Sequence, residues 1–226
     1  MRVRLHPRDN GCEKNLLFTP RMYEPLELAA LESDIARVAA QRRPFVFVDI
    51  GANVGLFSFF VAARAKHGAR ILAVEPEPGN LRRLNFNIRA NPGVPIKVIP
   101  KALSDEEGLV AVEVDHRDRG GTRTKKISQA GASADVVLVP AQTLLDILAG
   151  EGVDSVDAVK IDVEGLEDAI LDPFFRDAPR GLWPQLVIIE DSRPSWRVDI
   201  ISIMAAKGYS LTARSTQNNL ILRLGH

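Results

Sequence analysis

Three acidic residues stand where short apolar runs end. Asp49 ends "FVFVD", Glu75 ends "ILAVE" and Asp162 ends "VKID". A carboxylate at such a position can accept hydrogen bonds from both hydroxyls of a ribose, and a carboxylate beside a reacting hydroxyl can take its proton. The spacing of these acids therefore predicts a ligand site with three contributors.

Two glycines follow the first acid in "DIGANVGLF". Gly51 permits a tight turn, and Gly55 lets the start of the next helix approach a ligand, where free N–H groups carry partial positive charge. A dinucleotide-binding loop has a further glycine where Asn53 stands, so a pyrophosphate would meet a side chain there. S-adenosylmethionine has no phosphate, and an acid followed by G-x-x-x-G suits its amino-acid end better.

Alternating strands and helices must position these residues. The pattern predicts a mostly parallel sheet with helices on both faces, in which ligands bind beyond the carboxyl ends of the strands. Strands are expected at 1–5, 45–50, 69–76, 94–103 (interrupted by Pro100), 156–163 and 184–190, with a closing hairpin at 209–214 and 218–224. Helices are expected at 25–40, 56–66, 78–91, 141–150, 164–171 and 197–208.

One region breaks this alternation. Two strands, 108–115 and 134–141, flank a connector rich in glycine, serine and basic residues between Arg117 and Lys126. This connector is either a solvated loop or a lid that contacts an anionic substrate. We divide the chain into an N-terminal strand and helix (1–44) that cap the site, and a ligand-binding domain (45–226) with an inserted hairpin at about 108–140.

The composition narrows the possible functions. The chain has 226 residues, 46% of them hydrophobic, and 29 basic residues balance 29 acidic ones, so no overall field attracts nucleic acid or membrane. One cysteine, Cys12, lies in a polar segment that resembles a loop and has no cue for reactivity. We expect a cytoplasmic protein without a signal peptide or a membrane span, because no apolar run is suited to either. We expect no metal site, because the histidines (His6, His67, His116, His226) are dispersed. Trp183 and Trp196 are expected to pack.

The sequence resembles the FkbM family of S-adenosylmethionine-dependent methyltransferases. The motifs "FVDIGANVGLFS", "AVEPEPGNLRRLNFNI", "ALSDEEG", "VKIDVEGLE" and "LVIIE" occur in the family's order, and "YEP" at Tyr23 to Pro25 precedes the first core helix. The resemblance spans roughly residues 5–222. It implies a Rossmann-like class I methyltransferase fold that uses S-adenosylmethionine and releases S-adenosylhomocysteine.

The resemblance also implies roles for individual residues. The methionyl end of the cofactor would be held by Asp49, Gly51, Asn53 and Gly55, and the ribose by Glu75. Ser104 and Asp105 would enclose the adenine. Asp162 would face both the sulfonium and the acceptor.

The reaction expected is O-methylation of a small molecule, sugar or natural product. Asp162 and Glu164 are the first candidates for its base, Glu190 is a third, and Lys160 could orient them. An RNA methyltransferase, a nucleotide-dependent oxidoreductase and a non-catalytic cofactor-binding protein remain alternatives. The neutral overall charge disfavours an RNA methyltransferase. Asn53, in place of a glycine, disfavours an oxidoreductase, and the intact acids Asp49, Glu75 and Asp162 disfavour a non-catalytic protein. No residue pattern predicts the acceptor or the oligomeric state.

Overall fold

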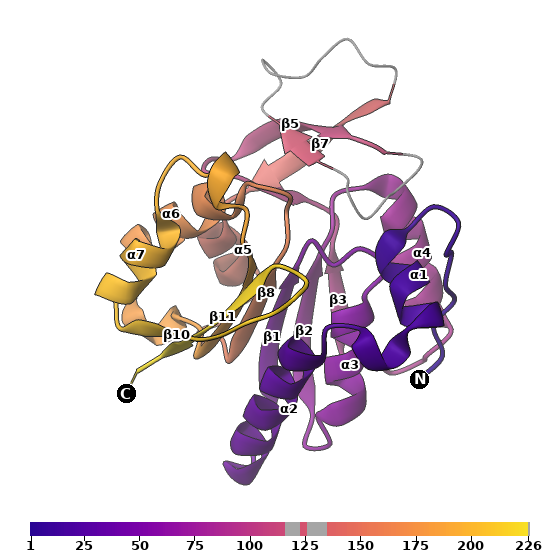
Figure 1. The fold of residues 1–226 in the computed structure, drawn as a ribbon, viewed down its shortest axis with the longest axis horizontal. Helices are drawn as coiled ribbons and strands as arrows, with labels where there is room; N and C mark the ends of the chain where they lie inside the picture. Colours follow the sequence, from indigo (N-terminus) through magenta and orange to yellow (C-terminus); the bar gives the residue numbers. More distant parts are fainter. Residues whose placement is uncertain (116–122, 126–134, 226) are drawn as a thin grey trace.

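Seven strands form the central sheet of the computed structural model, which describes residues 1–115, 123–125 and 135–225. The order of the strands is β10-β11-β9-β8-β1-β2-β3 (Figure 1). The five neighbouring strands β9, β8, β1, β2 and β3 run parallel, and β11 is antiparallel to both of its neighbours. The strands are β1 (Phe45–Ile50), β2 (Ala69–Val74), β3 (Ile96–Ile99), β8 (Ala158–Ile161), β9 (Leu186–Glu190), β10 (Tyr209–Arg214) and β11 (Asn219–Leu224). The predicted parallel sheet with a closing hairpin is confirmed.

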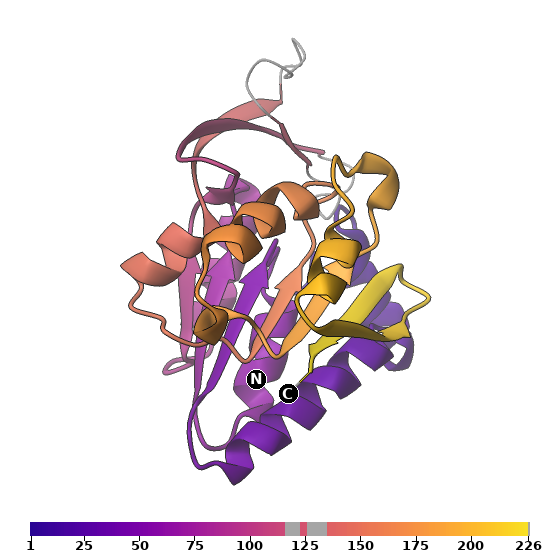
Figure 2. The same cartoon turned by 90° about the vertical axis from the view of Figure 1, so that its left-hand side faces the viewer.

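Helices cover both faces of this sheet, as their apolar stripes require. Helices α2 and α3 lie on one face of the sheet, and α5, α6 and α7 lie on the other (Figures 1 and 2). Leu31 and Phe57 pack in the core on the first face, and Ile147, Phe174 and Met204 pack in the core on the second. The bounds are α2 (Pro25–Ala40), α3 (Leu56–Arg64), α4 (Pro78–Arg89), α5 (Leu144–Gly150), α6 (Glu167–Asp177) and α7 (Ile200–Ala206). Short 3-10 turns occur at η1 (Pro20–Met22), η4 (Arg180–Leu182) and η5 (Arg193–Ser195). None of the helices in the described ranges has the length and apolar character of a membrane span.

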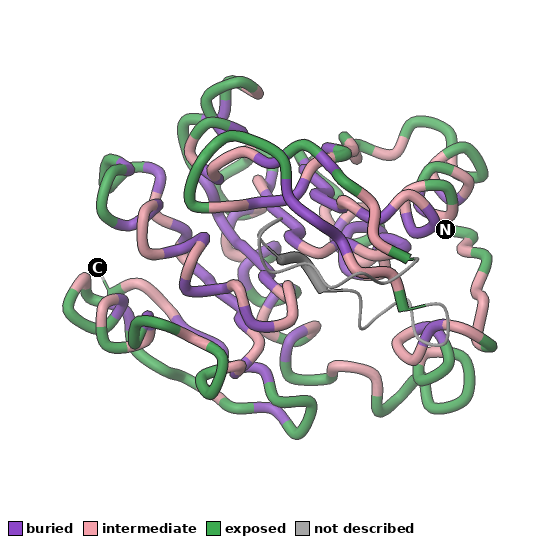
Figure 3. Tube along the Cα trace, turned by 90° about the horizontal axis from the view of Figure 1, so that it is seen from above, coloured by how far each residue is buried: buried purple, intermediate pink, exposed green. Residues whose placement is uncertain are grey.

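The centre of the sheet is buried on both faces. All four residues of β8 are buried, and so are the first four of β9. Figure 3 shows buried chain running through the middle of the molecule, with exposed segments around it. Strands buried in this way read as continuous apolar runs, which is why the sequence predicts them well.

The inserted region forms a second sheet, with order β4-β7-β5-β6. The predicted hairpin is its centre, where β5 and β7 pair antiparallel (Figure 1). The strands are β4 (Ala102–Leu103), β5 (Gly108–Glu113), β6 (Arg123–Lys125) and β7 (Val136–Gln142). Apart from the strand β6, the basic connector and His116 lie outside the described residues.

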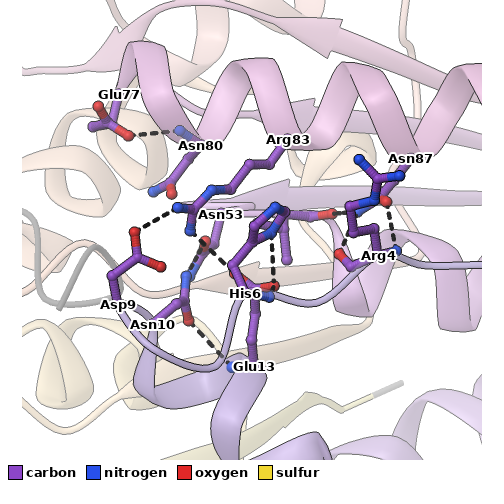
Figure 4. A network of polar contacts seen from close by, with 11 residues as sticks. Arg4, His6, Asp9, Asn10, Glu13, Asn53, Glu77, Asn80, Arg83 and Asn87 are labelled. Atoms are coloured by element: carbon purple, nitrogen blue, oxygen red, sulfur yellow. Dashed lines mark hydrogen bonds and ion pairs between the residues drawn. The ribbon is translucent and has the colours of Figure 1, made fainter.

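The predicted strand at 1–5 is wrong. These residues pair with no strand, because asparagine side chains of α4 and the turn after it satisfy their backbone groups. Asn91 accepts from the N–H of Arg2 at 2.8 Å. Asn87 accepts from the N–H of Arg4, also at 2.8 Å (Figure 4). Asn87 and Asn91 are four residues apart, so both lie on one side of the helix axis and reach the same extended segment.

The segment around Cys12 is helical rather than a loop. Helix α1 (Gly11–Phe18) begins after Asn10, whose side chain accepts from the N–H of Glu13 at 3.2 Å. This is an ordinary helix N-cap. The sequence "NGCEKN" hides it, because its polar residues and glycine are also typical of loops.

Candidate active site

The carboxyl ends of β1, β2 and β8 open onto one cavity. Seven of the predicted residues line it together: Asp49, Gly51, Asn53, Glu75, Lys160, Asp162 and Glu164. The cavity is also lined by residues that were not among the predicted site residues: Cys12, Tyr23, Glu24, Leu56, Phe57 and Asn80. Topology brings the acids together as predicted, because parallel strands end at the same edge of a sheet.

Gly51 allows the loop after β1 to pass close to the loop after β8. Its φ is +74°, and a Cβ at this position would lie 1.9 Å from the carbonyl oxygen of Asp162. Glycine at position 55 was predicted to let the helix start approach a ligand, but the structure gives another explanation for it. A Cβ there would lie 2.6 Å from Leu84 of α4, so this glycine permits helix packing at the start of α3.

Glu75 is held by backbone donors at the end of β2. The N–H of Asn53 donates to one carboxylate oxygen at 2.7 Å, and the N–H of Glu77 donates to the other at 2.8 Å. Burial raises the pKa of Glu75 to about 7, although these hydrogen bonds oppose the shift. The Asn80 side chain is a further hydrogen-bond partner of this carboxylate, which still has an accepting lone pair for a ligand hydroxyl.

Asn53 also joins the cavity to the N-terminal segment. Its backbone adopts a positive φ of 52°, and its side-chain oxygen accepts from the Nδ2 of Asn10 at 2.8 Å (Figure 4). The same segment is fastened to α4 by Arg83, which donates to Asp9 at 2.5 Å. The loop that carries Asn53 is therefore held against the N-terminal segment, which is itself held against α4.

Asp49 is fully buried beneath the loop. One oxygen accepts from both the N–H and the hydroxyl of Ser58, at 3.0 and 2.6 Å. Burial raises the pKa of Asp49, while the Lys160 ammonium and the Ser58 hydrogen bonds lower it. These contacts fix the start of α3 relative to β1, so Asp49 shapes the cavity as well as lining it.

Lys160 is the cation among the lining residues. Its Nζ lies 2.7 Å from an Asp162 oxygen and 4.9 Å from the ring centroid of Phe57, and the residue is 4% exposed. Burial alone would lower the pKa of Lys160, but Asp162, Asp49 and Glu24 raise it above its ordinary value. The ammonium therefore stays charged and neutralises part of a strongly acidic cavity.

The loop after β8 turns sharply. Glu164 has a φ of 58° and Gly165 a φ of 105°. Glu167, not Glu164, ties this loop to the start of α6, because its carboxylate accepts from the N–H groups of Val163 and Gly165 at 3.0 and 3.2 Å. Glu164 lines the cavity and lies before α6, which begins at Glu167.

Glu190 lies next to this loop, at the end of β9. One oxygen from each of Asp162, Glu164 and Glu190 lies within 4.8 Å of the others. Burial and these neighbouring acids raise the pKa of Glu190 to about 7. Clustered carboxylates can attract a cation, but the expectation of no metal stays a prediction.

Ser104 and Asp105 do not line the cavity. The N–H of Ser104 donates to Gln142 at 3.1 Å and its hydroxyl donates to Asp105 at 3.1 Å, at the entry to the second sheet. Their predicted contact with an adenine stays a prediction.

The two tryptophans have structural roles, as expected. Trp183 packs edge-on against Phe175, and the indole N–H of Trp196 donates to Glu167 at 2.8 Å.

Comparison with known proteins identifies the family. The sequence profile described as the methyltransferase FkbM domain matches residues 49–211, which is more than half of the chain. The chain belongs to the FkbM methyltransferase family. The resemblance read from the motifs is thereby confirmed, and membership implies that the protein uses a methyl donor.

Two named relatives support this membership. Methyltransferase sdnD of Sordaria araneosa is 27% identical, over 79% of this chain and 78% of sdnD. The antimetabolite synthetase AmbE of Pseudomonas aeruginosa is 46% identical over 63 residues, which are 27% of this chain and 3% of AmbE. The chain therefore matches most of the first relative, whereas only 63 of its residues match a small part of the second.

Solved structures share the fold. The FkbM methyltransferase from Methylobacillus flagellatus superimposes with a TM-score of 0.53 at 16% identity, covering 80% of this chain and 43% of that one. The METTL16 methyltransferase domain superimposes with a TM-score of 0.56 at 14% identity, and the match covers 99% of this chain and 72% of that one. Our chain thus spans less than half of the M. flagellatus protein. At such low identity, these structures show the Rossmann-like fold and nothing about substrates.

The chemistry of the lining residues fits S-adenosylmethionine. Five carboxyl groups face one ammonium: Glu24, Asp49, Glu75, Asp162 and Glu164 against Lys160. This excess of acids suits a sulfonium cation and the hydroxyl donors of a ribose, and it would repel the pyrophosphate of a dinucleotide.

Proposed function

We propose that this domain is an O-methyltransferase that carries a methyl group from S-adenosylmethionine to a hydroxyl of a small molecule, sugar or natural product. The observation that carries the proposal is the Glu75 carboxylate, which backbone N–H groups hold at the end of β2 in an acidic cavity. Family membership supports the transfer of a methyl group. The hydroxyl acceptor rests on the resemblance to FkbM methyltransferases.

Different parts of the cavity would serve the two substrates. We call Asp49, Asn53 and Glu75 the donor side, and Glu24, Lys160 and Asp162 the acceptor side. Glu75 would hold the ribose hydroxyls, and the loop with Gly51 and Asn53 would hold the methionyl end. Gly55 would support this loop through packing.

When bound, S-adenosylmethionine supplies a methyl group on a positively charged sulfur, and displacement at that methyl needs an acceptor oxygen in line. Positioning of this kind can supply about 7–11 kcal/mol of the barrier. The Lys160–Asp162 pair at the end of β8 would orient the acceptor side, because its 2.7 Å contact fixes both side chains. Asp162 and Glu164 are near enough to the cavity to act as bases.

Calorimetric titration with S-adenosylhomocysteine, with NAD in a parallel titration, tests the proposal. We expect saturable binding of S-adenosylhomocysteine at one site and no binding of NAD. Binding of NAD alone would make the domain a nucleotide-dependent oxidoreductase. Failure of both ligands to bind would leave a family member that has lost its cofactor site.

A further inference from the structure

Glu24 is a cavity residue held in a strained conformation. Its backbone is left-handed, with φ 45° and ψ 46°, immediately before Pro25 at the start of α2. Left-handed conformations are unusual for glutamate, and proline favours an extended residue before it. Such strain costs about 1–3 kcal/mol and persists where the surroundings impose it, often at functional positions.

The closing hairpin imposes this conformation. The Nδ2 of Asn219, at the start of β11, donates to Glu24 at 2.7 Å and to Glu27 at 2.9 Å. The side chain of Gln217 donates to the carbonyl of Met22 at 3.1 Å. Segments at opposite ends of the chain thus join to place one carboxyl group in the cavity.

The surroundings of Glu24 allow its carboxyl group to gain and lose a proton. Burial raises its pKa to about 7; the Lys160 ammonium lowers it, while Glu27 and Asp162 raise it. Glu27 is fully buried, and its second oxygen has no hydrogen-bond partner among the described residues. A proton on Glu24 is stabilised by a hydrogen bond to Glu27, which also raises the pKa of Glu24.

Three of the four other acids that line the cavity are already bound to another group of the protein. Asp162 is bound to Lys160 at 2.7 Å, and Asp49 is bound to Ser58. Both oxygens of Glu75 accept backbone N–H groups. Glu190 does not line the cavity.

We propose that Glu24 faces the acceptor and takes the proton from its hydroxyl group during methyl transfer. This inference rests on the proposed function. The acceptor oxygen supplies the electron pair of its new bond to the methyl carbon, and the sulfur keeps the pair of the bond that breaks. The hydroxyl proton goes to the Glu24 carboxylate and then to water. The products are neutral S-adenosylhomocysteine and a methyl ether, so atoms and charge balance.

The assignment implies a particular class of acceptor. With Lys160 already paired to Asp162, the acceptor side offers carboxylates to its ligand. A neutral hydroxyl can donate a hydrogen bond to Glu24, whereas a phosphate or carboxylate next to it would be repelled. The acceptor group is therefore an uncharged alcohol or sugar hydroxyl.

Sinefungin tests the position of Glu24 without an acceptor. In this analogue a carbon atom replaces the sulfur, and a protonated amine on that carbon takes the place of the methyl group that would be transferred. For the wild-type protein at pH 8.5, we expect sinefungin to bind about tenfold more tightly than S-adenosylhomocysteine, because the ionised Glu24 attracts the amine. This preference should shrink as the pH falls through 7 and Glu24 takes up a proton.

The variant Glu24→Gln should lose both the preference and its pH dependence while binding S-adenosylhomocysteine within about twofold of wild type, since only the charge is removed. Glu32→Gln is the control, because this exposed glutamate is paired with Arg64 and does not line the cavity; it should keep both the preference and its pH dependence. Glu24→Asp checks for misfolding and should keep part of the preference.

Two results are decisive. If Glu24→Gln binds S-adenosylhomocysteine normally and keeps the full preference for sinefungin, the assignment of Glu24 is overturned and the proposed function stands. If the wild-type protein does not bind S-adenosylhomocysteine, the proposed function fails first and the inference fails with it.

Discussion

The donor side and the acceptor side of the cavity are held together by different kinds of contact. On the donor side, Asp49 is bonded to Ser58, and Glu75 to the N–H of Asn53; these pairs lie 9 and 22 residues apart in the chain. On the acceptor side, Glu24 is bonded to Asn219, 195 residues away. The donor side is thus held mainly by contacts within one β-α-β unit, whereas Glu24 of the acceptor side is held by a residue of the closing hairpin that is distant in the chain.

This difference has a functional consequence. Contacts within one unit form whenever that unit folds, so the donor side can stay the same while other parts of the molecule change. The acceptor side depends on how the N-terminal segment docks on the closing hairpin. If the proposed roles hold, changes in either segment should alter the acceptor side more than the donor side, which would let one fold serve different substrates.

The two sides meet at Gly51, where we expect the largest effect. Gly51→Ala places a methyl group 1.9 Å from the Asp162 carbonyl at a φ of +74°. The free energy of unfolding, from urea denaturation, should fall by about 3 kcal/mol or more. Gly93→Ala is the control, because Gly93 has a φ of +82° with nothing near its Cβ, and it should cost about 1 kcal/mol. Equal losses would show that Gly51 is not a close contact between the two sides.

Glu75→Ala tests the donor side alone. Loss of charge-assisted hydrogen bonds to the ribose should weaken S-adenosylhomocysteine binding by about 100-fold in calorimetry. Because the pKa of Glu75 is about 7, the wild-type affinity should also fall as the pH drops from 8 to 6, and the variant should lack this dependence. The control is Glu32→Ala, at an exposed residue paired with Arg64. An affinity within threefold of wild type would exclude Glu75 from the ribose site.

Asn219→Ala tests the tie across the acceptor side. The variant leaves Glu24 and the buried Glu27 without their shared donor, so the free energy of unfolding should fall by about 2 kcal/mol. Affinity for S-adenosylhomocysteine should stay within twofold, because the donor side is built separately. A large loss of this affinity would contradict the division into two sides.

Glu190→Gln should give the smallest effect. The pKa of Glu190 in the folded protein is about 7, above its ordinary value of 4.5, so the native state binds this proton more tightly than the unfolded chain. Its stabilising contribution is complete below pH 4.5 and is lost as the pH rises through 7. Relative to the variant, wild type should lose about 1 kcal/mol of stability between pH 5 and 8, after allowance for solvent screening. A constant difference across this range would mean that Glu190 is not perturbed.

The donor side is also the part that the sequence predicts best. Asp49 and Glu75 follow apolar runs, and the topology of parallel strands then brings them to one edge of the sheet without knowledge of any long-range contact. The same reasoning places Asp162 of the acceptor side at this edge. Gly51 was likewise expected to form a tight turn. The reason for Gly55 could not be predicted, because it depends on Leu84 of a different helix.

The structure of the N-terminal segment and the position of Glu24 could not be predicted from the sequence. The strand predicted at 1–5 failed because its alternating residues pair with Asn87 and Asn91 instead of a strand. Glu24 appeared only within the motif "YEP", since its position depends on Asn219. A helix N-cap at Asn10 was the signal that could have revealed α1.

A crystal structure of the protein with S-adenosylhomocysteine tests the account most directly. We predict that the ribose hydroxyls bind the Glu75 carboxylate and that the sulfur faces Glu24 and Asp162 across the cavity. An S-adenosylhomocysteine molecule bound with its ribose away from Glu75, or with its sulfur turned away from Glu24 and Asp162, would contradict the division into donor and acceptor sides.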